Sequence, residues 1–345
     1  MFQEKLLDTI NKNITNNFTD NFDFARFGKT EKDIIDTTKS LEKITPYFPK
    51  ILSFYNLLED ERSKELLIKL VAFRILGHRK IKLPLSMPAY EKACKLVDSI
   101  LDKEKYIYPG FLGWKLYFGD LSKINIPFSI YTLSEDVVVT FLLKQYEYRI
   151  NENEYIRVEP GDTVIDAGGC WGDTALYFSN EAGSNGKVFT FEFIPKNLEI
   201  FHKNIELNPK LKENIELIQN PLWNKSDIPM YYSDNGPGSI VSFNPIENFS
   251  GITHSITIDD LVDRKNVNKI DFIKMDIEGS ELYALKGAVN TIKKFKPKLA
   301  VAIYHNLDDF VNIVHYVNDF GLGYKFYIGH FTIHYEETVL FCKAD

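Results

Sequence analysis

Residues 164–193 constrain the fold more than any other part of this chain. The apolar pair Val164 and Ile165 leads into a glycine-rich turn, helix-forming residues follow, and a second apolar segment ends at Glu192 and Phe193. This order predicts a strand, a tight turn, a helix and a second strand. Such a unit is typical of α/β sheets that hold an adenosine-containing cofactor at the turn.

The turn itself carries the first candidate cofactor-binding residues. Gly168, Gly169 and Gly172 lack a Cβ, so the backbone there can turn tightly and approach a ligand closely. Backbone amides at the start of the following helix attract negative charge. Ala167 and Thr174 flank the glycines, and we expect them to contact the cofactor as well.

Two acids distinguish between cofactors. Glu192 follows Gly172 by twenty residues, where an acid can accept hydrogen bonds from both ribose hydroxyls, with Phe193 beside it. Asp166 precedes the glycines, where it would repel a pyrophosphate but could hold the cationic methionine end of S-adenosylmethionine, directly or through water. The spacing is also G-G-x-x-G rather than the dinucleotide G-x-G-x-x-G. These features favour S-adenosylmethionine over a dinucleotide as the cofactor. They also argue against the alternative that this is an ordinary tight turn in which the acids occur by chance.

Composition narrows the class of protein. The 345 residues include 41 Lys and Arg against 48 Asp and Glu, a net charge of −7, which disfavours nucleic acid as a partner. The three cysteines lie far apart without metal-ligand spacing, as expected in a reducing compartment. The N-terminus is polar, and no apolar run is long enough to span a bilayer, so we expect a cytoplasmic protein without a membrane partner.

The rest of the chain predicts an α/β domain that follows a helical region. We place a helical N-terminal accessory region, with an extended lead-in over about residues 1–28, at residues 1–130, and the cofactor-binding domain at residues 131–345. The accessory region is read as a helical layer, with a substrate-shaping or dimerising role as the alternative. Aromatic and β-branched runs in residues 106–158 suggest extended structure, including a hairpin around residues 151–154.

Strands and helices alternate after residue 193. Further strands are expected at residues 215–219, 270–275 and 297–304, with one helix over residues 280–295 and a long insertion at residues 226–253 that is typical of a lid or binding loop. Residues 324–328 and 338–342 are two strands whose connection is too short for a helical crossover, so they should pair antiparallel. This describes a class I methyltransferase, Rossmann-like sheet with a terminal antiparallel strand, and it argues against a dehydrogenase.

Polar residues at the predicted carboxyl ends of the strands are the candidates for catalysis. Asp276 and Glu278 follow the fourth strand, where one could anchor substrate or act as base while the other caps the next helix; both could instead serve only the helix end. His305 ends the fifth strand and could take a proton from a hydroxyl, or be structural. His330 could complete the pocket. A metal site with Asp276 lacks close ligand spacing, so no metal is expected. Asn220, after the third strand, is placed beside the adenine.

These residues resemble the FkbM family of methyltransferases. The likeness rests on the segments 164–178, 191–193, 270–281, 297–300, 304–305 and 330–341 and covers residues 145–343; residues 58–63 and 72–74 are only loosely similar. The resemblance implies S-adenosylmethionine-dependent O-methylation of sugars or natural-product hydroxyls, often in polysaccharide biosynthesis. Some family members carry Arg where this chain has Gly329, so a basic anchor for an acidic substrate is absent at that position.

The sequence therefore predicts an O-methyltransferase with a small-molecule or glycan acceptor. The turn from Asp166 to Gly172 should hold the methionine part of the cofactor and Glu192 its ribose, while Asp276 and His305 orient and deprotonate the acceptor hydroxyl. A nicotinamide oxidoreductase and a non-catalytic binding protein on the same fold are the alternatives. Assembly into a homodimer is left open.

Overall fold

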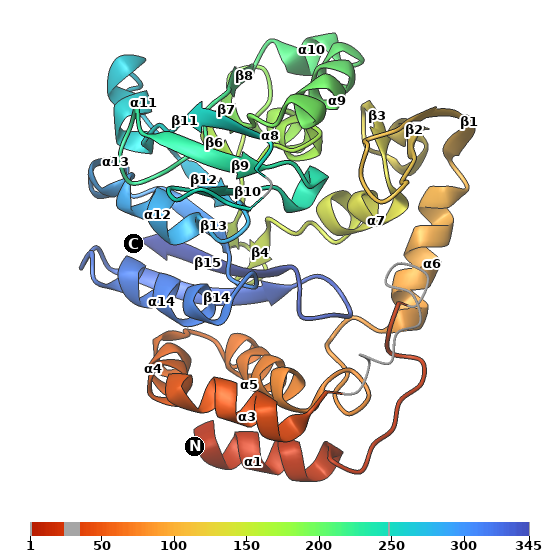
Figure 1. Cartoon of the computed structure of the whole chain (residues 1–345), viewed down its shortest axis with the longest axis vertical. Coiled ribbons are helices and arrows are strands. Elements are labelled where there is room, and N and C mark those ends of the chain that lie inside the picture. Colours follow the sequence, from red (N-terminus) through yellow and green to blue (C-terminus); the bar gives the residue numbers. More distant parts are fainter. Residues whose placement is uncertain (1, 24–34, 248, 345) are drawn as a thin grey trace.

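The computed structural model describes residues 2–23, 35–247 and 249–344. Figure 1 shows the N-terminal helices at one end of the molecule, a large sheet flanked by helices in the middle, and a small sheet formed by β1–β3 beside it. Among the described residues, no helix has the length and apolar character that crossing a bilayer would need.

A seven-stranded sheet forms the centre of the fold, in the order β14-β15-β13-β12-β6-β7-β8. Its strands are β6 (Thr163–Ala167), β7 (Lys187–Phe191), β8 (Ile215–Ile218), β12 (Phe272–Met275), β13 (Lys298–Ala302), β14 (Tyr324–His330) and β15 (Thr338–Ala344). The neighbours from β8 to β13 pair in parallel, whereas β15 runs antiparallel to both β13 and β14. This confirms the predicted fold class, including the reversed last strand.

The strands are apolar on both faces because helices cover the sheet on each side. On one side, the residues that face α11 (Ile258–Arg264), α12 (Glu281–Lys286), α13 (Val289–Phe295) and α14 (Leu307–Asn318) are Ile165, Phe189, Ile273 and Leu299. On the other side, the residues that face α8 (Asp173–Ala182) and α9 (Pro195–Glu206) are Val164, Val188, Phe272 and Ala300. These helices leave the carboxyl ends of β6, β7 and β12 uncovered, and the candidate active site lies at these ends.

The N-terminal helices are α1 (Phe2–Asn13), α3 (Thr37–Ile44), η2 (Thr45–Tyr47), α4 (Phe48–Leu57), α5 (Glu61–Leu76) and α6 (Met87–Asp98). Of these, α5 packs against β14 at the edge of the sheet and α4 packs against α14, whereas α1 and α3 pack on α5. The Ile328 amide donates to Ser63 Oγ at 3.0 Å, and Phe54 of α4 packs edge-on against Phe310 of α14. These contacts attach the helical region to the sheet, and the domain boundary near residue 130 stays a prediction.

Smaller elements connect these layers. They are β1 (Leu101–Ile107), β2 (Leu116–Asp120), η3 (Leu121–Ile124), β3 (Ser129–Thr132), α7 (Ser134–Asp136), η4 (Val137–Leu142), β4 (Tyr148–Arg149), β5 (Tyr155–Ile156), α10 (Pro209–Lys212), β9 (Pro229–Ser233), η5 (Gly236–Gly238), β10 (Ile240–Ser242) and β11 (Gly251–His254). The pairing of β4 with β5 confirms the hairpin around residues 151–154.

Three local predictions are wrong. Residues 2–13 form the helix α1 rather than a loose lead-in, because Phe2 and Leu6 are buried and Phe2 packs on Tyr55; residues 24–28 of that prediction lie outside the described residues. Within the stretch expected to be extended, η4 is a π-helical turn that buries its β-branched side chains. The helix expected over residues 280–295 is split into α12 and α13 at Gly287, where a Cβ would lie 2.2 Å from the Trp223 carbonyl oxygen.

Candidate active site

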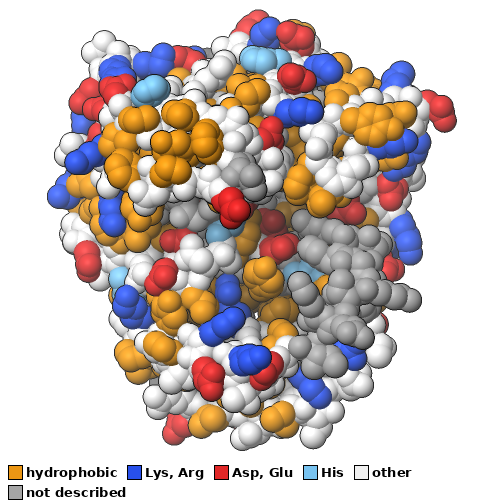
Figure 2. Space-filling model, viewed as in Figure 1, with side chains coloured by type: hydrophobic (Ala, Val, Ile, Leu, Met, Phe, Trp, Pro, Cys, Tyr) orange, Lys and Arg blue, Asp and Glu red, His pale blue; other side chains and the backbone are white. Residues whose placement is uncertain are grey.

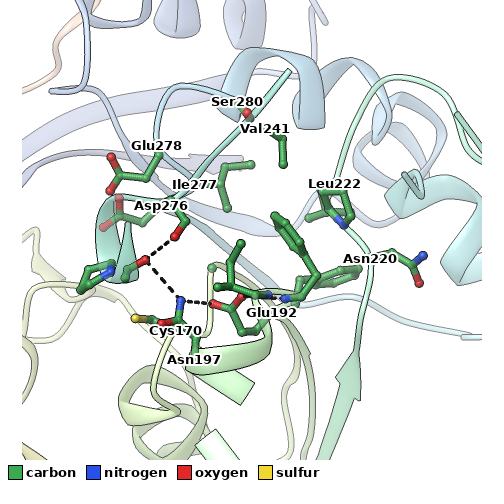
Figure 3. A pocket seen from close by; sticks show the side chains of 18 residues that line it. Cys170, Glu192, Asn197, Asn220, Leu222, Val241, Asp276, Ile277, Glu278 and Ser280 are labelled. Carbon is green, nitrogen blue, oxygen red and sulfur yellow. Dashed lines mark hydrogen bonds between the residues drawn. The ribbon is translucent and has the colours of Figure 1, made fainter. Parts of the chain in front are cut away.

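A cleft opens at the carboxyl ends of β6, β7 and β12, where open α/β sheets bind their ligands (Figure 3). It encloses about 600 Å³ of space, including the open solvent at its mouth. The lining residues are Gly168, Cys170, Phe191, Glu192, Phe193, Ile194, Asn197, Asn220, Pro221, Leu222, Gly236, Pro237, Ser239, Val241, Asp276, Ile277, Glu278 and Ser280.

The glycine turn shapes the floor of the cleft. Gly168 has φ +92°, and a Cβ at this position would lie 2.0 Å from the carbonyl oxygen of Asp276. A Cβ on Gly169 would lie 2.3 Å from Thr190 Oγ1. Only glycine therefore allows the end of β6 to lie directly against the end of β12. This close approach places the turn and Asp276 on the same wall of the cleft.

Glu192 is held rigidly at the end of β7. Its Oε1 accepts hydrogen bonds from the amides of Phe193 (2.6 Å) and Ile194 (2.7 Å), and its Oε2 accepts one from Asn197 Nδ2 (3.2 Å). Burial raises the pKa of Glu192 to about 7, against the lowering effect of these donors. The carboxylate is oriented by the chain, with Oε2 able to accept further bonds from a ligand.

The insertion between β8 and α11 forms the opposite wall. Asn197 Nδ2 also donates to the Gly236 carbonyl oxygen (3.3 Å), which accepts a second bond from Ser239 Oγ (2.6 Å). Figure 3 shows this chain of hydrogen bonds running from the insertion to Glu192. The turn at Gly236 therefore borders the same cleft as the acid at the end of β7.

Asp166 does not face the cleft, and the prediction that it holds the methionine end directly needs correction. Its side chain is 0% exposed. Its carboxylate accepts hydrogen bonds from Thr174 Oγ1 (2.9 Å) and Thr190 Oγ1 (2.8 Å), and it lies 3.2 Å from Lys274 Nζ. Lys274 in turn donates to the carbonyl oxygens of Ala167 and Gly168. Asp166 thus stabilises the glycine turn from behind.

The other expected cofactor residues divide into two groups. Gly168, Glu192, Phe193, Asn220 and Asp276 line the cleft, whereas Ala167, Gly169, Gly172 and Thr174 support it from outside. Asn220 Nδ2 donates to the His254 carbonyl oxygen at 2.8 Å, and Figure 3 shows its amide turned away from the centre of the cleft. This orientation does not support its predicted contact with the adenine edge.

Asp276 is the centre of a polar cluster at one end of the cleft. It accepts hydrogen bonds from the hydroxyls of Tyr146 (3.1 Å) and Tyr304 (3.1 Å), and it lies 3.0 Å from His305 Nε2. Burial alone would raise the pKa of Asp276, but His305 and the nearby Lys274 outweigh it and lower the pKa. Asp276 is therefore an ionised group whose acceptor sites are already engaged.

Glu278 is the carboxylate in this cluster that keeps contact with solvent. Its backbone has φ +56°, which is unusual for a side-chain-bearing residue and marks the tight turn that follows β12. Its side chain is 32% exposed. Burial and the repulsion of Asp276 and Glu281 raise the pKa of Glu278 to about 7, although His305 partly offsets the shift.

The geometry does not favour the predicted role of His305 as a neutral base. Its Nε2 lies 3.0 Å from Asp276 Oδ1 and 3.2 Å from Glu281 Oε1, while its Nδ1 lies 3.6 Å from Glu278 Oε2. Burial lowers the pKa of His305, but the two carboxylates on Nε2 outweigh burial and raise it to about 12. Its Nε2 is therefore engaged by two carboxylates and is not free to take a proton from an acceptor.

His330 does not complete the cleft, and its expected catalytic role needs correction. It lies in β14, where its Nδ1 is 2.9 Å from Thr338 Oγ1, and burial lowers its pKa to about 3. It is not among the residues that line the cleft. His330 is a neutral residue of the terminal hairpin.

Several residues of the site were not predicted from the sequence. Tyr146 and Tyr304 bind Asp276, Asn197 binds Glu192, and Lys274 holds the turn. Lys274 carried a usable signal, since a charged residue inside an apolar strand must find a buried partner. Tyr304 is adjacent to a residue already singled out, but nothing near Tyr146 in the sequence indicates that it reaches Asp276.

Comparison with known proteins identifies the class. The family model for the methyltransferase FkbM domain matches residues 154–326, half of the chain. The chain belongs to the FkbM family of methyltransferases, and its cofactor is S-adenosylmethionine. No curated protein matches the sequence.

One solved structure shows the same fold. An FkbM methyltransferase from Methylobacillus flagellatus KT is 18% identical with a TM-score of 0.52, over 87% of this chain and 60% of that chain. The present chain thus spans less than two thirds of that protein. Weaker matches are Aeropyrum pernix fibrillarin with bound S-adenosyl-L-methionine (15% identity, TM-score 0.36, 53% and 67% of the two chains) and a SAM-dependent methyltransferase from Aquifex aeolicus (15%, 0.35, 69% and 98%).

The lining of the cleft fits this cofactor. Glu192 offers a carboxylate oxygen to ribose hydroxyls, and Phe193, Leu222 and Ile277 offer apolar surface for a flat adenine ring. Asp276 lies at the other end of the cleft from Glu192, and its negative charge suits a cationic sulfonium. We therefore expect the cofactor to lie across the cleft from Glu192 to Asp276.

The raised pKa of Glu192 predicts a pH dependence of cofactor binding. Only the ionised carboxylate accepts hydrogen bonds at full strength, so the affinity for S-adenosylmethionine should increase as pH rises from about 6 to about 8 and then level off. Without cofactor, stability should fall as pH rises from the ordinary value of 4.5 towards 7, because the folded state holds this proton more tightly. Calorimetric titration measures the first effect. A Glu192→Gln variant should bind more weakly and lose this pH dependence, and equal pH dependence in the variant would contradict the assignment.

Proposed function

We propose that this protein transfers the methyl group of S-adenosylmethionine to a hydroxyl oxygen of a sugar or natural-product acceptor. The observation that carries the proposal is the position of Glu278, a partly exposed carboxylate at the cofactor cleft, beside the ionised Asp276. A hydroxyl is a poor nucleophile until a base removes its proton, and Glu278 is placed to do so.

We assign a separate role to each residue of the site. When bound, S-adenosylmethionine supplies an electrophilic methyl group. Glu192 fixes the ribose, and the acceptor hydroxyl is oriented at the Asp276 end of the cleft, where Glu278 takes its proton. His305 lies between Asp276 and Glu278 and holds both side chains in place. Positioning supplies up to roughly 7–11 kcal/mol and a general base about 10²–10⁴-fold in rate, so positioning is the larger contribution.

The charge around the cleft supports a neutral, hydroxyl-rich acceptor. The lining residues that the structure describes include Glu192, Asp276 and Glu278 but neither Lys nor Arg. Acidic and histidine side chains also gather around the middle of the face shown in Figure 2. An anionic acceptor would be repelled here, and the net charge of −7 likewise argues against nucleic acid. We propose a small-molecule or glycan acceptor, as in polysaccharide biosynthesis, and a cytoplasmic location, which the three free cysteines support.

The proposal is tested by identifying the product. The full chain is incubated with methyl-labelled S-adenosylmethionine and fractionated glycans and small molecules from a cell extract, and the labelled product is analysed by NMR. We expect the label in an O-methyl group whose formation requires the active protein. A label on nitrogen or carbon, or transfer that continues with heat-inactivated protein, would contradict the proposal.

A further inference from the structure

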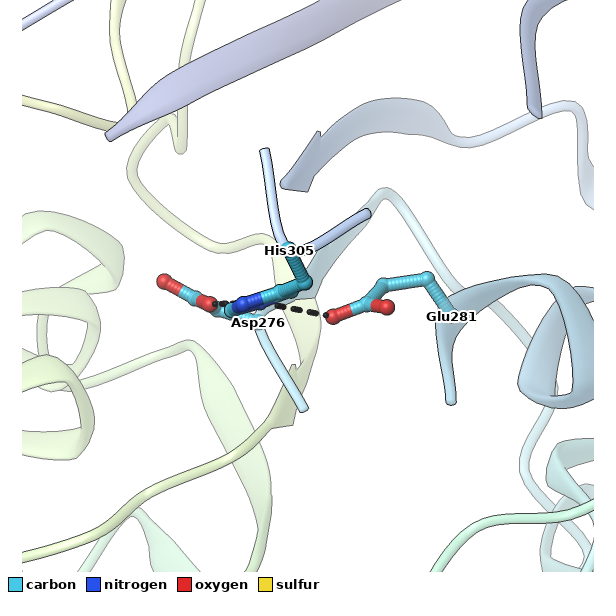
Figure 4. A group of neighbouring side chains, drawn as sticks. All are labelled: Asp276, Glu281 and His305. Carbon is cyan, nitrogen blue, oxygen red and sulfur yellow. Dashed lines mark hydrogen bonds and ion pairs between the residues drawn. The ribbon is translucent and has the colours of Figure 1, made fainter. Parts of the chain in front are cut away.

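Three potential metal ligands converge beside the cofactor cleft. Asp276 follows β12, Glu281 opens α12 and His305 follows β13, and one ligand atom from each lies within 4.8 Å of the others. Figure 4 shows both carboxylates directed at the imidazole. The two separations from Nε2, 3.0 and 3.2 Å, match the distance of about 3 Å between neighbouring ligand atoms in a six-coordinate site with bonds of about 2.1 Å.

The charges of this group do not balance. Asp276 and Glu281 face Nε2, and Glu278 lies 3.6 Å from Nδ1, so three carboxylates surround one imidazole. Even a protonated His305 neutralises only one of them. Lys274 is already engaged by Asp166 and two carbonyl oxygens. Because buried charges are normally paired or bound to metals, a divalent cation would suit this group better than a single proton.

Glu281 supplies an independent observation. Its side chain is 0% exposed. Its Oε1 accepts a hydrogen bond from the Ile277 amide at 2.7 Å, whereas its Oε2 has no hydrogen-bond partner in the structure. The amide contact at the start of α12 accounts for one oxygen only. A buried carboxylate oxygen without a donor is costly, and a cation among these side chains would offset that cost.

We propose that Asp276, Glu281 and His305 bind a divalent transition-metal cation of the Mn²⁺ type. Two carboxylates suit hard cations and the imidazole selects a first-row transition metal. Glu278, on the Nδ1 side, would orient the ring so that Nε2 faces the cation. This departs from the sequence-based expectation of no metal. A role for the cation in holding an acceptor oxygen rests on the proposed O-methylation, whereas the site itself does not.

Mn²⁺ binding to the chelator-treated full chain tests the proposal, with free Mn²⁺ measured by electron paramagnetic resonance. We expect one Mn²⁺ per chain, and a dissociation constant raised about tenfold or more by Glu281→Gln, which keeps an oxygen for the Ile277 amide. Asp309→Asn is the matched control: it removes one negative charge near His305 and Glu281 without removing a ligand, so its affinity should stay close to that of the unchanged chain.

Thermal melting shows whether Glu281→Gln folds. If it does not, His305→Gln serves as the second ligand variant and should weaken Mn²⁺ binding by a similar factor. Absence of bound Mn²⁺ at millimolar concentration, or equal affinity in the ligand variants and in Asp309→Asn, would overturn the proposal. The measurement needs neither acceptor nor methyl transfer. A chain that binds Mn²⁺ at this site yet methylates no hydroxyl would therefore contradict the proposed function alone.

Discussion

Replacing Glu278 by Gln should lower the turnover number by about 10²–10⁴-fold, the usual contribution of a general base. The amide has nearly the same shape but cannot take a proton from the acceptor hydroxyl. His305 cannot replace it, because its Nε2 faces Asp276 and Glu281 rather than the cleft. The measurement is methyl transfer at saturating cofactor and acceptor, once the acceptor has been identified.

Two controls accompany this variant. Glu278→Gln should bind S-adenosylmethionine about as tightly as the unchanged chain, because Glu192 and not Glu278 is assigned to the ribose. Glu199→Gln removes an exposed acid from α9 and should leave turnover unchanged. Full turnover in Glu278→Gln would show that another group accepts the proton, or that the acceptor needs no base.

Replacing Asp166 by Ala should destabilise the fold by about 3–5 kcal/mol, the range for breaking a buried ion pair by removing one partner. Lys274 would keep its charge at 1% exposure with no carboxylate at 3.2 Å, and the hydroxyls of Thr174 and Thr190 would lose their acceptor. Denaturant unfolding of the cofactor-free protein measures the loss.

The exposed Asp263 of α11 provides the comparison, since Asp263→Ala should change stability by no more than about 0.5 kcal/mol. Cofactor affinity separates the two roles that Asp166 could have. If Asp166→Ala kept its stability but bound S-adenosylmethionine much more weakly, the carboxylate would contact the cofactor, and its assignment to the turn would be wrong.

Local sequence signals predicted much of the fold. The strands β6, β7, β8, β12 and β13 are short apolar runs that end at glycine or polar residues, and the short connection between β14 and β15 allows only an antiparallel pair. The glycine turn was also identifiable, because three glycines between a strand and a helix have few other uses. The helix break at Gly287 was not, since its cause is a contact with Trp223, which is distant in the sequence.

The chemistry of the site was less predictable than its location. The sequence placed Asp276, Glu278 and His305 at one edge of the sheet. The protonation of these side chains depends on distances in the folded chain, which the spacing of residues along the sequence does not determine. Glu281 lies at the start of a helix, and its position in the sequence does not reveal that its carboxylate faces His305 Nε2. Tyr146 reaches Asp276 across 130 residues of chain. Such contacts arise only from the packed fold.

We assign S-adenosylmethionine to the cleft between Glu192 and Asp276, and a crystal structure of the chain with S-adenosylhomocysteine would test this assignment. We expect the ribose hydroxyls within hydrogen-bonding distance of Glu192 and the sulfur at the end of the cleft that holds Asp276 and Glu278. Density for the nucleoside outside this cleft, or a ribose that does not contact Glu192, would contradict it.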